Sequence, residues 1–366
     1  MLSKISLIVP VYNVEAYLDQ CLTSLVNQTM QDIEIVLVED RSTDSSRSIA
    51  EEWSHRDERI HLVCHQKNLG LSAARNTGLQ HCHAPYVLFV DSDDYVAPNY
   101  CEALYKTITH HEADLAMCGT EIFSEGENRS PDFGHYWDTP GRRDTGCCSL
   151  TEHELRETNP CVWNKIYRRD LIVEHQLTFP DGLKHEDEYW WRLYTSYAKT
   201  MAWISEKLYY YRQRSNSIMR GVTQDDRLDL IQVAMRFYDE ACDRNLEEKK
   251  AFALLFFAEA LKVQYQRSEQ AEEPALLERR IRELAVSFVN SHSLSESDFP
   301  KNLKHVYDYA KEGGSSQSGI FHVRRTPTEK IYSLGEGFPL WKWRFKEKKV
   351  EGLLLGCLPL WWQRFK

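Results

Sequence analysis

The first 120 residues alternate short, unbroken apolar runs with segments that repeat apolar residues at helical spacing. Apolar runs rich in β-branched residues occupy positions 5–11, 33–38, 60–64 and 86–90, and each predicts a buried strand. The intervening segments predict helices, because apolar residues recur three or four positions apart or follow polar clusters that start helices. Strands buried on both faces and joined by helices form parallel sheets. The pattern therefore predicts an α/β fold with a doubly wound, mostly parallel sheet.

This rhythm changes after position 120. Residues 121–150 collect Gly, Pro, Ser and charged residues, which predicts a long loop or lid. Helical and aromatic-rich patterns return between 151 and 215, and from 221 to 290 the pattern is helical and highly charged. Residues 313–319 are rich in Gly and Ser, a composition typical of a flexible linker. We therefore expect a C-terminal helical extension, followed by a linker and a separate tail.

The tail contains an internal repeat with a spacing of twenty residues. The segment Pro339-Leu340-Trp341 with Arg344-Phe345-Lys346 recurs as Pro359-Leu360-Trp361 with Arg364-Phe365-Lys366. From position 322 to 366 there are ten Lys or Arg residues and four acids. The whole chain has 45 basic and 55 acidic residues, hence a formal net charge of −10. A basic tail is therefore attached to an acidic body.

Composition excludes several classes of protein. A chain of 366 residues with 42% hydrophobic and 27% charged residues is typical of a globular protein with two domains, or with one large domain and an extension. The negative net charge argues against nucleic-acid binding. No apolar run is long enough to span a bilayer, and the first residues do not resemble a signal peptide. We therefore expect a cytoplasmic protein whose ten cysteines stay reduced.

Polar turns follow four of the predicted strands, at the edge where open α/β sheets bind ligands. The last of these turns, Asp91-Ser92-Asp93-Asp94, places three carboxylates within four residues. Such carboxylates repel one another and raise one another's pKa unless a cation is present. Oxygen ligands of this kind suit Mg²⁺ or Mn²⁺ shared with phosphate groups. A solvated loop that caps the next helix is the alternative interpretation.

Taken together, these turns resemble the inverting glycosyltransferases of family 2, of the bacterial surface-polysaccharide type. The resemblance rests on Ile8-Val9-Pro10-Val11-Tyr12-Asn13, on Glu39-Asp40-Arg41-Ser42-Thr43-Asp44, on residues 70–78 and on Phe89-Val90-Asp91-Ser92-Asp93-Asp94. It is strong over residues 4–120 and looser to about 217. The resemblance implies an A-type glycosyltransferase fold, a nucleotide-sugar donor (most often a UDP-sugar) and Mn²⁺ or Mg²⁺ as cofactor.

The resemblance also implies which residues bind the nucleotide-sugar. Pro10 and Tyr12 correspond to the loop beside the base, and Asp40 to the carboxylate that accepts a hydrogen bond from the base. Arg75 corresponds to a residue near the nucleotide, with a surface salt bridge as its alternative role. The family's usual turn is Asp-Asp-Gly-Ser, so Arg41 stands where a glycine would tolerate unusual backbone angles.

The acidic turn corresponds to the family's DxD signature. Asp91 and Asp93 match its two carboxylates and are expected at the nucleotide-sugar. Asp93 is the first choice for direct contact with the metal, and Asp94 is either a second ligand or a residue that supports one.

A segment near position 186 resembles the part of the family that carries the catalytic base. An inverting transfer needs one group that removes the proton from the acceptor hydroxyl as this hydroxyl attacks the anomeric carbon. Glu186 and Asp187 match the family's Glu-Asp motif, which implies that Asp187 is the base, and His185 is its competitor. Clustered acids are also a common device at helix N-termini.

Two weaker matches concern the acceptor or the departing diphosphate. Lys165 lies in Trp163-Asn164-Lys165-Ile166-Tyr167-Arg168, which resembles a segment near the acceptor, and Arg212 follows Tyr211 where a basic side chain reaches the diphosphate in the family. For both segments, an aromatic core beside surface charges is the alternative.

The resemblance and the pattern together predict five parts: a nucleotide-sugar-binding part (1–120), an acceptor-binding part (121–220), a helical region (221–312), the linker (313–319) and the basic amphipathic tail (320–366). Trp, Phe and Leu beside Lys and Arg suit the headgroup region of an anionic membrane, so the tail is expected to place the protein on the inner face of the plasma membrane. Packing of these aromatic residues on the helical region, or on a second copy of the chain in a homo-oligomer, is the alternative.

The predicted function is metal-dependent transfer of a sugar from a nucleotide-sugar to a hydroxyl of a saccharide or lipid-linked acceptor, as in the synthesis of capsule, lipopolysaccharide or exopolysaccharide. A nucleotidyltransferase that forms a nucleotide-sugar is one alternative, although the turn after the first run lacks the Gly- and Lys-rich phosphate loop of such enzymes. A non-catalytic saccharide-binding protein on the same fold is the other alternative.

Overall fold

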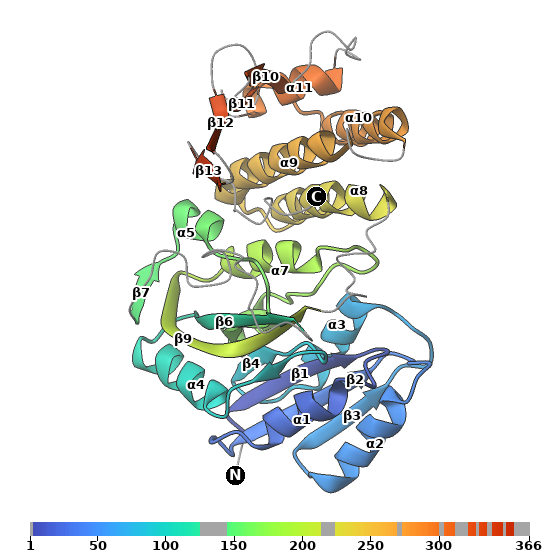
Figure 1. Cartoon of the computed structure of the whole chain (residues 1–366), viewed down its shortest axis with the longest axis vertical. Helices are drawn as coiled ribbons and strands as arrows, with labels where there is room; N and C mark the ends of the chain where they lie inside the picture. Colours follow the sequence, from blue (N-terminus) through green and yellow to red (C-terminus); the bar gives the residue numbers. More distant parts are fainter. Residues whose placement is uncertain are drawn as a thin grey trace. The chain divides into compact units, whose positions relative to one another are not determined.

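The computed structural model describes residues 3–124, 145–213, 224–268, 273–299, 304–311, 321–326, 329–334, 339–346 and 349–354. These residues separate into two compact units, one that ends at residue 213 and one that extends from 224 to 354 (Figure 1). The linker expected at 313–319 and the second copy of the tail repeat, 359–366, lie outside the described residues.

The first unit consists of strands and helices in alternation. Its elements are β1 (Ile5–Val11), α1 (Leu18–Val26), β2 (Ile33–Glu39), α2 (Ser46–Arg56), β3 (Ile60–Cys64), α3 (Leu71–His81), β4 (Tyr86–Phe89), β5 (Tyr95–Val96), α4 (Tyr100–His110), β6 (Leu115–Ser124), β7 (Gly146–Ser149), α5 (Glu152–Glu157), β8 (Lys165–Arg168), α6 (Arg169–Glu174), α7 (Glu186–Thr195) and β9 (Thr200–Gln213). The four apolar runs at the start of the chain thus form β1 to β4.

The strands of this unit form one sheet in the order β3-β2-β1-β4-β8-β6-β9-β5, with β7 added on β9. From β3 to β4 all strands are parallel, as the sequence predicts. β8 then pairs antiparallel with both β4 and β6, and β5 and β7 pair antiparallel with β9. The predicted doubly wound α/β fold is confirmed, and beyond β4 its sheet is mixed.

Helices cover both faces of the parallel half. Ile5, Leu7 and Val9 of β1 belong to a core cluster that includes the buried side chains of α1 and α4. On the other face Ile8 meets Gly78 of α3, where a Cβ would come within 2.2 Å of Ile8 Cγ2. Gly78 therefore permits α3 to lie close to β1, and this contact places the residues of α3 beside the ends of the strands.

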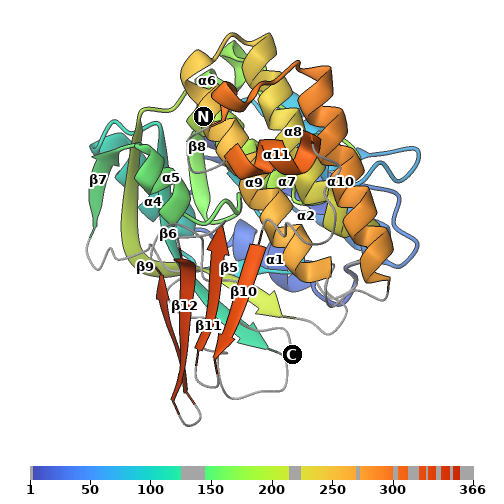
Figure 2. The same cartoon turned by 90° about the horizontal axis from the view of Figure 1, so that it is seen from above.

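The second unit consists of helices and a small sheet. Its elements are α8 (Gln224–Asp243), α9 (Glu247–Ser268), α10 (Pro274–Ser291), the short 3₁₀ helix η2 (Glu296–Asp298), α11 (Lys304–Lys311), β10 (Phe321–Thr326), β11 (Glu329–Leu334), β12 (Pro339–Lys346) and β13 (Lys349–Leu354). The four strands pair antiparallel in chain order. The tail predicted as an amphipathic segment thus contains β-hairpins, and Figure 2 shows β10, β11 and β12 side by side. None of the described helices is long and apolar enough to cross a membrane.

Candidate active site

The loops that follow β1 and β2 are held together by hydrogen bonds. Asn13 has a left-handed backbone with φ of 51°, and its Oδ1 accepts the N–H of Thr43 at 2.8 Å. The N–H of Val14 donates to Ser46 Oγ at 2.8 Å. Tyr12, directly before this junction, leaves 45% of its surface exposed. An aromatic ring is thus presented to solvent by a loop with a fixed backbone, at the carboxyl end of the central strand where α/β sheets bind ligands.

Asp40 is a buried carboxylate that connects β2 to the turn before α3. Its Oδ1 accepts the N–H of Leu69 at 2.8 Å and lies 2.7 Å from His65 Nδ1, and its Oδ2 accepts the N–H of Gly70 at 2.7 Å. His65 Nε2 lies 2.9 Å from Thr77 Oγ1. A carboxylate offers about four acceptor positions, so Asp40 keeps about one for a ligand. Asp40 is therefore firmly oriented.

Arg41 has a left-handed backbone, with φ of 62°, and an exposed side chain. This is the position where the resembling family has glycine, and the left-handed region costs about 1–2 kcal/mol for a residue with a Cβ. The turn keeps the backbone conformation suited to glycine although the residue is arginine.

The acidic turn after β4 is anchored from β9. Asp94 is buried, and its Oδ1 accepts the backbone N–H of Arg212 at 2.7 Å while its Oδ2 accepts the hydroxyl of Tyr209 at 2.8 Å. The same hydroxyl accepts the N–H of Asp91 at 3.1 Å, and Arg212 Nε donates to the carbonyl of Asp93 at 2.8 Å. Burial, together with the charges of Asp93 and Asp91, raises the pKa of Asp94 well above its usual range. Negative charge is thus concentrated on a rigid turn.

Arg75 joins this turn to α7. The guanidinium is buried, its Nη2 donates to Asp91 Oδ1 at 2.9 Å, and its Nη1 donates to Glu186 Oε1 at 2.5 Å. It also lies over the ring of Phe179, 5.3 Å from the centroid. Burial alone would lower the pKa of Arg75, but Asp91, Glu186 and Asp187 outweigh it and raise that pKa. The surface salt bridge considered for Arg75 is therefore wrong, because this ion pair is internal.

Asp187 lies in the first turn of α7, between two further acids. Burial, followed by the charges of Glu186 and Glu188, raises the pKa of Asp187 to about 7, although Arg75 opposes this shift. Asp187 Oδ1 accepts the N–H of Glu188 at 2.9 Å, and the side chain keeps part of its surface accessible. A carboxylate with a pKa near neutral pH is well matched to accept a proton in catalysis. The helix is entered through His185, whose backbone is left-handed with φ of 64°.

Lys165 lies in the core. Its ammonium donates to the carbonyl oxygens of Asn159 at 2.8 Å and Cys161 at 2.6 Å and to Asn164 Oδ1 at 2.8 Å. An ammonium group has three N–H donors, so none remains for a diphosphate. Burial lowers the pKa of Lys165, and its contacts hold the turn before β8. The expectation that Lys165 contacts the acceptor or the diphosphate is corrected accordingly.

Arg212 lies at the acidic turn, as part of its support. The guanidinium is stacked between the rings of Tyr17 and Phe123, 4.8 Å and 4.7 Å from their centroids, and donates to Gln20 Oε1. Together with its bonds to Asp93 and Asp94, these contacts fix the basic side chain beside the carboxylates. The alternative of an exposed charge next to an aromatic core does not describe this buried residue.

Sequence reasoning missed two residues that organise the site, His65 and Tyr209. Neither belongs to a spacing pattern that would have identified it, since His65 is a single histidine and Tyr209 one of three consecutive tyrosines. Tyr209 is stacked on Trp163 with centroids 4.4 Å apart, and both rings are buried. A buried tyrosine needs a partner for its hydroxyl, and here that partner is the acidic turn.

The acidic turn fits a divalent cation that is shared with a diphosphate. Within the described parts of the chain, no three His, Cys, Asp or Glu side chains are grouped as a ligand set. Mg²⁺ in nucleotide sites needs only one or two carboxylates, together with phosphate oxygens and water. Asp91 and Asp93 keep part of their surface exposed, whereas both oxygens of Asp94 accept bonds from the protein. The pKa of Asp94 is raised first by burial and then by the negative charges of Asp93 and Asp91, and a cation would offset these charges.

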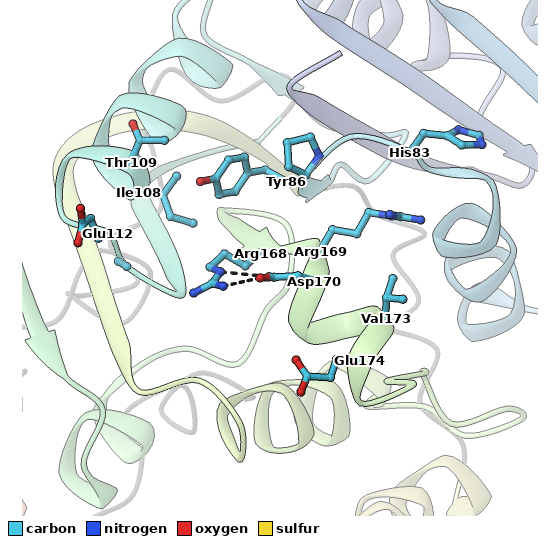
Figure 3. A pocket seen from close by; sticks show the side chains of 12 residues that line it. His83, Tyr86, Ile108, Thr109, Glu112, Arg168, Arg169, Asp170, Val173 and Glu174 are labelled. Atoms are coloured by element: carbon cyan, nitrogen blue, oxygen red, sulfur yellow. Dashed lines mark hydrogen bonds and ion pairs between the residues drawn. The ribbon is translucent and has the colours of Figure 1, made fainter. Parts of the chain in front are cut away.

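A separate pocket of about 840 Å³ opens near the start of β4 (Figure 3). Tyr86, the first residue of β4, lines this pocket, whereas the acidic turn follows the other end of the same strand. Arg168 and Asp170 form an ion pair within it. Its lining residues are His83, Pro85, Tyr86, Ile108, Thr109, Glu112, Ala113, Arg168, Arg169, Asp170, Val173 and Glu174. None of the predicted site residues lines this pocket.

Comparison with known proteins identifies the class. The family described as Glycosyl transferase family 2 matches residues 6–172. Glycosyltransferase GlyG of Streptococcus pneumoniae is 31% identical over 232 residues, which are 60% of this chain and 74% of GlyG. Putative glycosyltransferase EpsH of Bacillus subtilis is 38% identical over 222 residues, which are 59% of this chain and 62% of EpsH. The chain belongs to glycosyltransferase family 2, and the resemblance seen in the sequence is confirmed.

A solved structure extends the agreement in fold. The crystal structure of S. aureus TarS 1-349 in complex with UDP-GlcNAc superposes with a TM-score of 0.66 and 20% sequence identity, covering 92% of this chain and 98% of that one. The likeness confirms the predicted fold class, including helices after the catalytic sheet. The matched part spans under two thirds of the length of EpsH.

Proposed function

We propose that the chain is an inverting glycosyltransferase that moves a sugar from a nucleotide-sugar to a hydroxyl of a saccharide or lipid-linked acceptor. The observation that carries the proposal is the link from Asp91 through Arg75 to Glu186, next to Asp187 with its raised pKa. A donor-binding turn and a general base are thereby joined in one buried network. A saccharide-binding protein without catalysis would not need a carboxylate tuned to neutral pH.

The nucleotide is assigned to the loops after β1 and β2. Tyr12 offers its exposed ring to the base, Pro10 shapes the loop, and Asp40 accepts a hydrogen bond from the base through its remaining acceptor position. Arg75 acts on the nucleotide through Asp91, which it orients. Uridine is the expected base, and the binding of UDP-GlcNAc by TarS, a protein with the same fold, supports this choice.

The metal is assigned to Asp93 with Asp91. A bound Mn²⁺ or Mg²⁺ would stabilise the negative charge of the departing nucleoside diphosphate. Asp94 stabilises the turn, because its two carboxylate oxygens accept hydrogen bonds from Tyr209 and from the backbone of Arg212. Arg212 holds the carbonyl of Asp93 and adds positive charge beside the diphosphate position.

Asp187 is assigned as the base. As the acceptor oxygen attacks the anomeric carbon, its proton moves to the Asp187 carboxylate, and the bond from that carbon to the diphosphate oxygen breaks. The electron pair of this bond leaves with the diphosphate, and attack from the opposite side inverts the anomeric centre. Glu186, tied to Arg75, keeps the first turn of α7 in place.

The acceptor is proposed to be a growing surface polysaccharide or its lipid-linked precursor. Names of the relatives indicate glycosyl transfer without specifying this acceptor. An acceptor at the membrane fits a basic, aromatic tail that associates with the anionic inner face of the plasma membrane. We also propose that copies of the chain assemble into a homo-oligomer.

Product analysis tests the proposed reaction. The chain is incubated with a panel of nucleotide-sugars and Mn²⁺, with and without saccharide acceptors. Release of nucleoside diphosphate that increases with acceptor supports glycosyl transfer, whereas pyrophosphate would identify a nucleotidyltransferase. If nucleotide-sugars bind and remain intact with every acceptor, the saccharide-binding alternative replaces the proposal. If the chain keeps its full turnover after the divalent cations are removed by a chelator, the proposed reaction does not depend on a metal.

A further inference from the structure

His65 is a buried histidine that lies between Asp40 and Thr77. It directly follows β3, and its backbone N–H donates to the carbonyl of Glu39 at 2.9 Å, which extends the pairing of β3 with β2 by one bond. Only 8% of its side chain is exposed. Through this one ring, the residue after β2 is connected to the middle of α3. Both ring nitrogens have a partner, so the orientation of the ring is fixed.

The two partners of His65 determine where its proton lies. An ionised carboxylate can only accept a hydrogen bond, so the proton is on Nδ1, which lies 2.7 Å from Asp40 Oδ1. In the neutral imidazole the other nitrogen is then an acceptor, and the hydroxyl of Thr77 donates to Nε2 at 2.9 Å. Thr77 therefore orients the ring that donates to Asp40.

The hydrogen bonds of Asp40 leave a single acceptor position, and this position is on Oδ2. Oδ1 accepts the N–H of His65 and the backbone N–H of Leu69 at 2.8 Å, which fills both of its lone pairs. Oδ2 accepts only the backbone N–H of Gly70 at 2.7 Å. A ligand can therefore donate one hydrogen bond to this carboxylate, and cannot pair with both of its oxygens.

This restriction distinguishes nucleobases by the donors on the edge that a protein reads. Uracil presents one N–H between two carbonyl oxygens. Guanine presents a ring N–H and an amino group side by side, an arrangement that pairs with both oxygens of a carboxylate. At Asp40, which is 3% exposed, the second donor of guanine would remain without an acceptor. An unpaired donor in a buried site is unfavourable, so this site disfavours guanine.

We propose that His65 is a positioning residue that determines nucleotide specificity. By filling Oδ1 of Asp40, it selects a base with a single N–H donor, such as uracil, and acts against guanine without touching the nucleotide. The inference rests on the proposed function, because it requires that Asp40 meets the base. It adds the reason why this carboxylate accepts one kind of base. A histidine that only fills the core would affect stability and leave the choice of base unchanged.

Calorimetry of the full chain with Mn²⁺ and either UDP or GDP tests the proposal. The parent is expected to bind UDP at least about tenfold more tightly than GDP, which corresponds to about 1.4 kcal/mol. His65→Leu releases Asp40 and frees a position on Oδ1. UDP should therefore bind about tenfold more weakly to this variant, GDP should lose less, and the preference for UDP should decrease.

Two matched variants separate the hydrogen bond from the presence of the ring. His65→Asn retains an N–H close to the position of Nδ1 and should keep the parent's preference for UDP. His61→Leu makes the same change at an exposed histidine of β3 and should leave both affinities unchanged. With a nucleotide-sugar as substrate, the KM of His65→Leu should rise more than its kcat falls, because His65 acts on binding and not on the reacting atoms.

Thermal unfolding establishes that each variant is folded. If His65→Leu is not folded, Thr77→Val serves in its place, because it keeps the histidine but removes the hydroxyl that orients it, and it should reduce the preference for UDP about threefold. GDP binding to the parent as tight as UDP overturns the inference alone, and so does a preference that persists unchanged in the folded variant. If neither nucleotide binds to the parent, the proposed function itself is overturned.

Discussion

The two units use charged residues in opposite ways. In the catalytic unit Asp40, Asp94, Lys165 and Arg75 are buried, and each is held by several hydrogen bonds. In the second unit, the sequence of β12 alternates aromatic residues with lysine and arginine. Burial of a charge is costly unless it is paired, so a network of paired charges specifies one geometry. A periodic pattern assigns residues to a face without specifying individual contacts, whereas catalysis requires individual contacts.

The largest effect is expected from Asp187→Asn. The variant keeps the shape of the side chain but cannot accept the acceptor proton, so kcat should fall about 10²–10⁴-fold. Binding of nucleoside diphosphate, measured by calorimetry, should stay unchanged. The same variant should unfold at a higher temperature at pH 8, because the buried carboxylate no longer has to ionise. A kcat within threefold of the parent would assign the proton transfer to another group.

Arg75→Met tests the network that joins the two parts of the site. Removing the buried guanidinium leaves the partly exposed carboxylates of Asp91 and Glu186 without their partner, which is expected to cost about 3 kcal/mol of unfolding free energy. Chemical denaturation measures this cost. The matched control is Arg47→Met, whose ion pair with Glu51 is exposed and should contribute about 1 kcal/mol or less. Similar losses for both variants would contradict the distinction between internal and surface pairs.

The pH profile follows from the raised pKa of Asp187. The base must be ionised, so kcat/KM should be constant above pH 7 and fall tenfold per unit below it. Stability should run in the opposite direction. Because the folded state binds this proton more tightly than the unfolded state, the contribution of Asp187 to stability declines as pH rises from about 4 to 7. A kcat/KM limb with a midpoint near pH 4 would show that the carboxylate is not shifted in the enzyme.

Gly78→Ala should have a moderate effect through packing. The added methyl would meet Ile8 at 2.2 Å, and overpacking of this kind costs about 1–3 kcal/mol. Thermal unfolding of the variant measures the loss. Ile8→Ala removes the Cγ2 atom that the new methyl would meet, so it should cost less stability in the Gly78→Ala chain than in the parent chain. Equal costs in both chains would place the strain elsewhere than between α3 and β1.

The smallest effect is expected from the sheet. Trp341→Ser/Trp343→Ser should change the unfolding free energy of the catalytic unit by no more than about 0.5 kcal/mol, because both residues belong to the other compact unit. Limited proteolysis with detection of residues 3–213 follows that unit separately. A large change would mean that the two units stabilise each other.

The fold was largely predictable because burial imposes a period on the sequence. The runs that form β1 and β2 are buried along their whole length, as expected for strands of a parallel sheet that is covered on both faces. β8 was not predictable in the same way, because its short aromatic run fits a helix or a strand and its place between β4 and β6 depends on distant partners. Tertiary pairing, not local pattern, made the sheet mixed.

The residues of the site that belong to a sequence motif could be predicted, whereas the buried charged residues that support them could not. Asp91, Asp93 and Asp187 follow from resemblance, and the structure brings their segments together through Arg75. Lys165 was expected to contact a ligand because its segment resembles one near the acceptor in the family, yet three acceptors from its own turn satisfy its ammonium group. His65 has no sequence signal, since its partners Asp40 and Thr77 become neighbours only in the folded chain.

The arginine between Asp91 and Glu186 also limits how such enzymes can diverge. Arg75 lies in α3, Asp91 follows the end of β4 and Glu186 lies in α7. Three separate stretches of the sequence therefore form a single network of ion pairs. A substitution at 75 leaves two carboxylates without their partner, and a substitution at 91 or 186 leaves the buried guanidinium with one carboxylate in place of two. Anyone who adapts this scaffold to a new sugar therefore has most freedom outside this triplet, and should exchange its members together or leave all three alone.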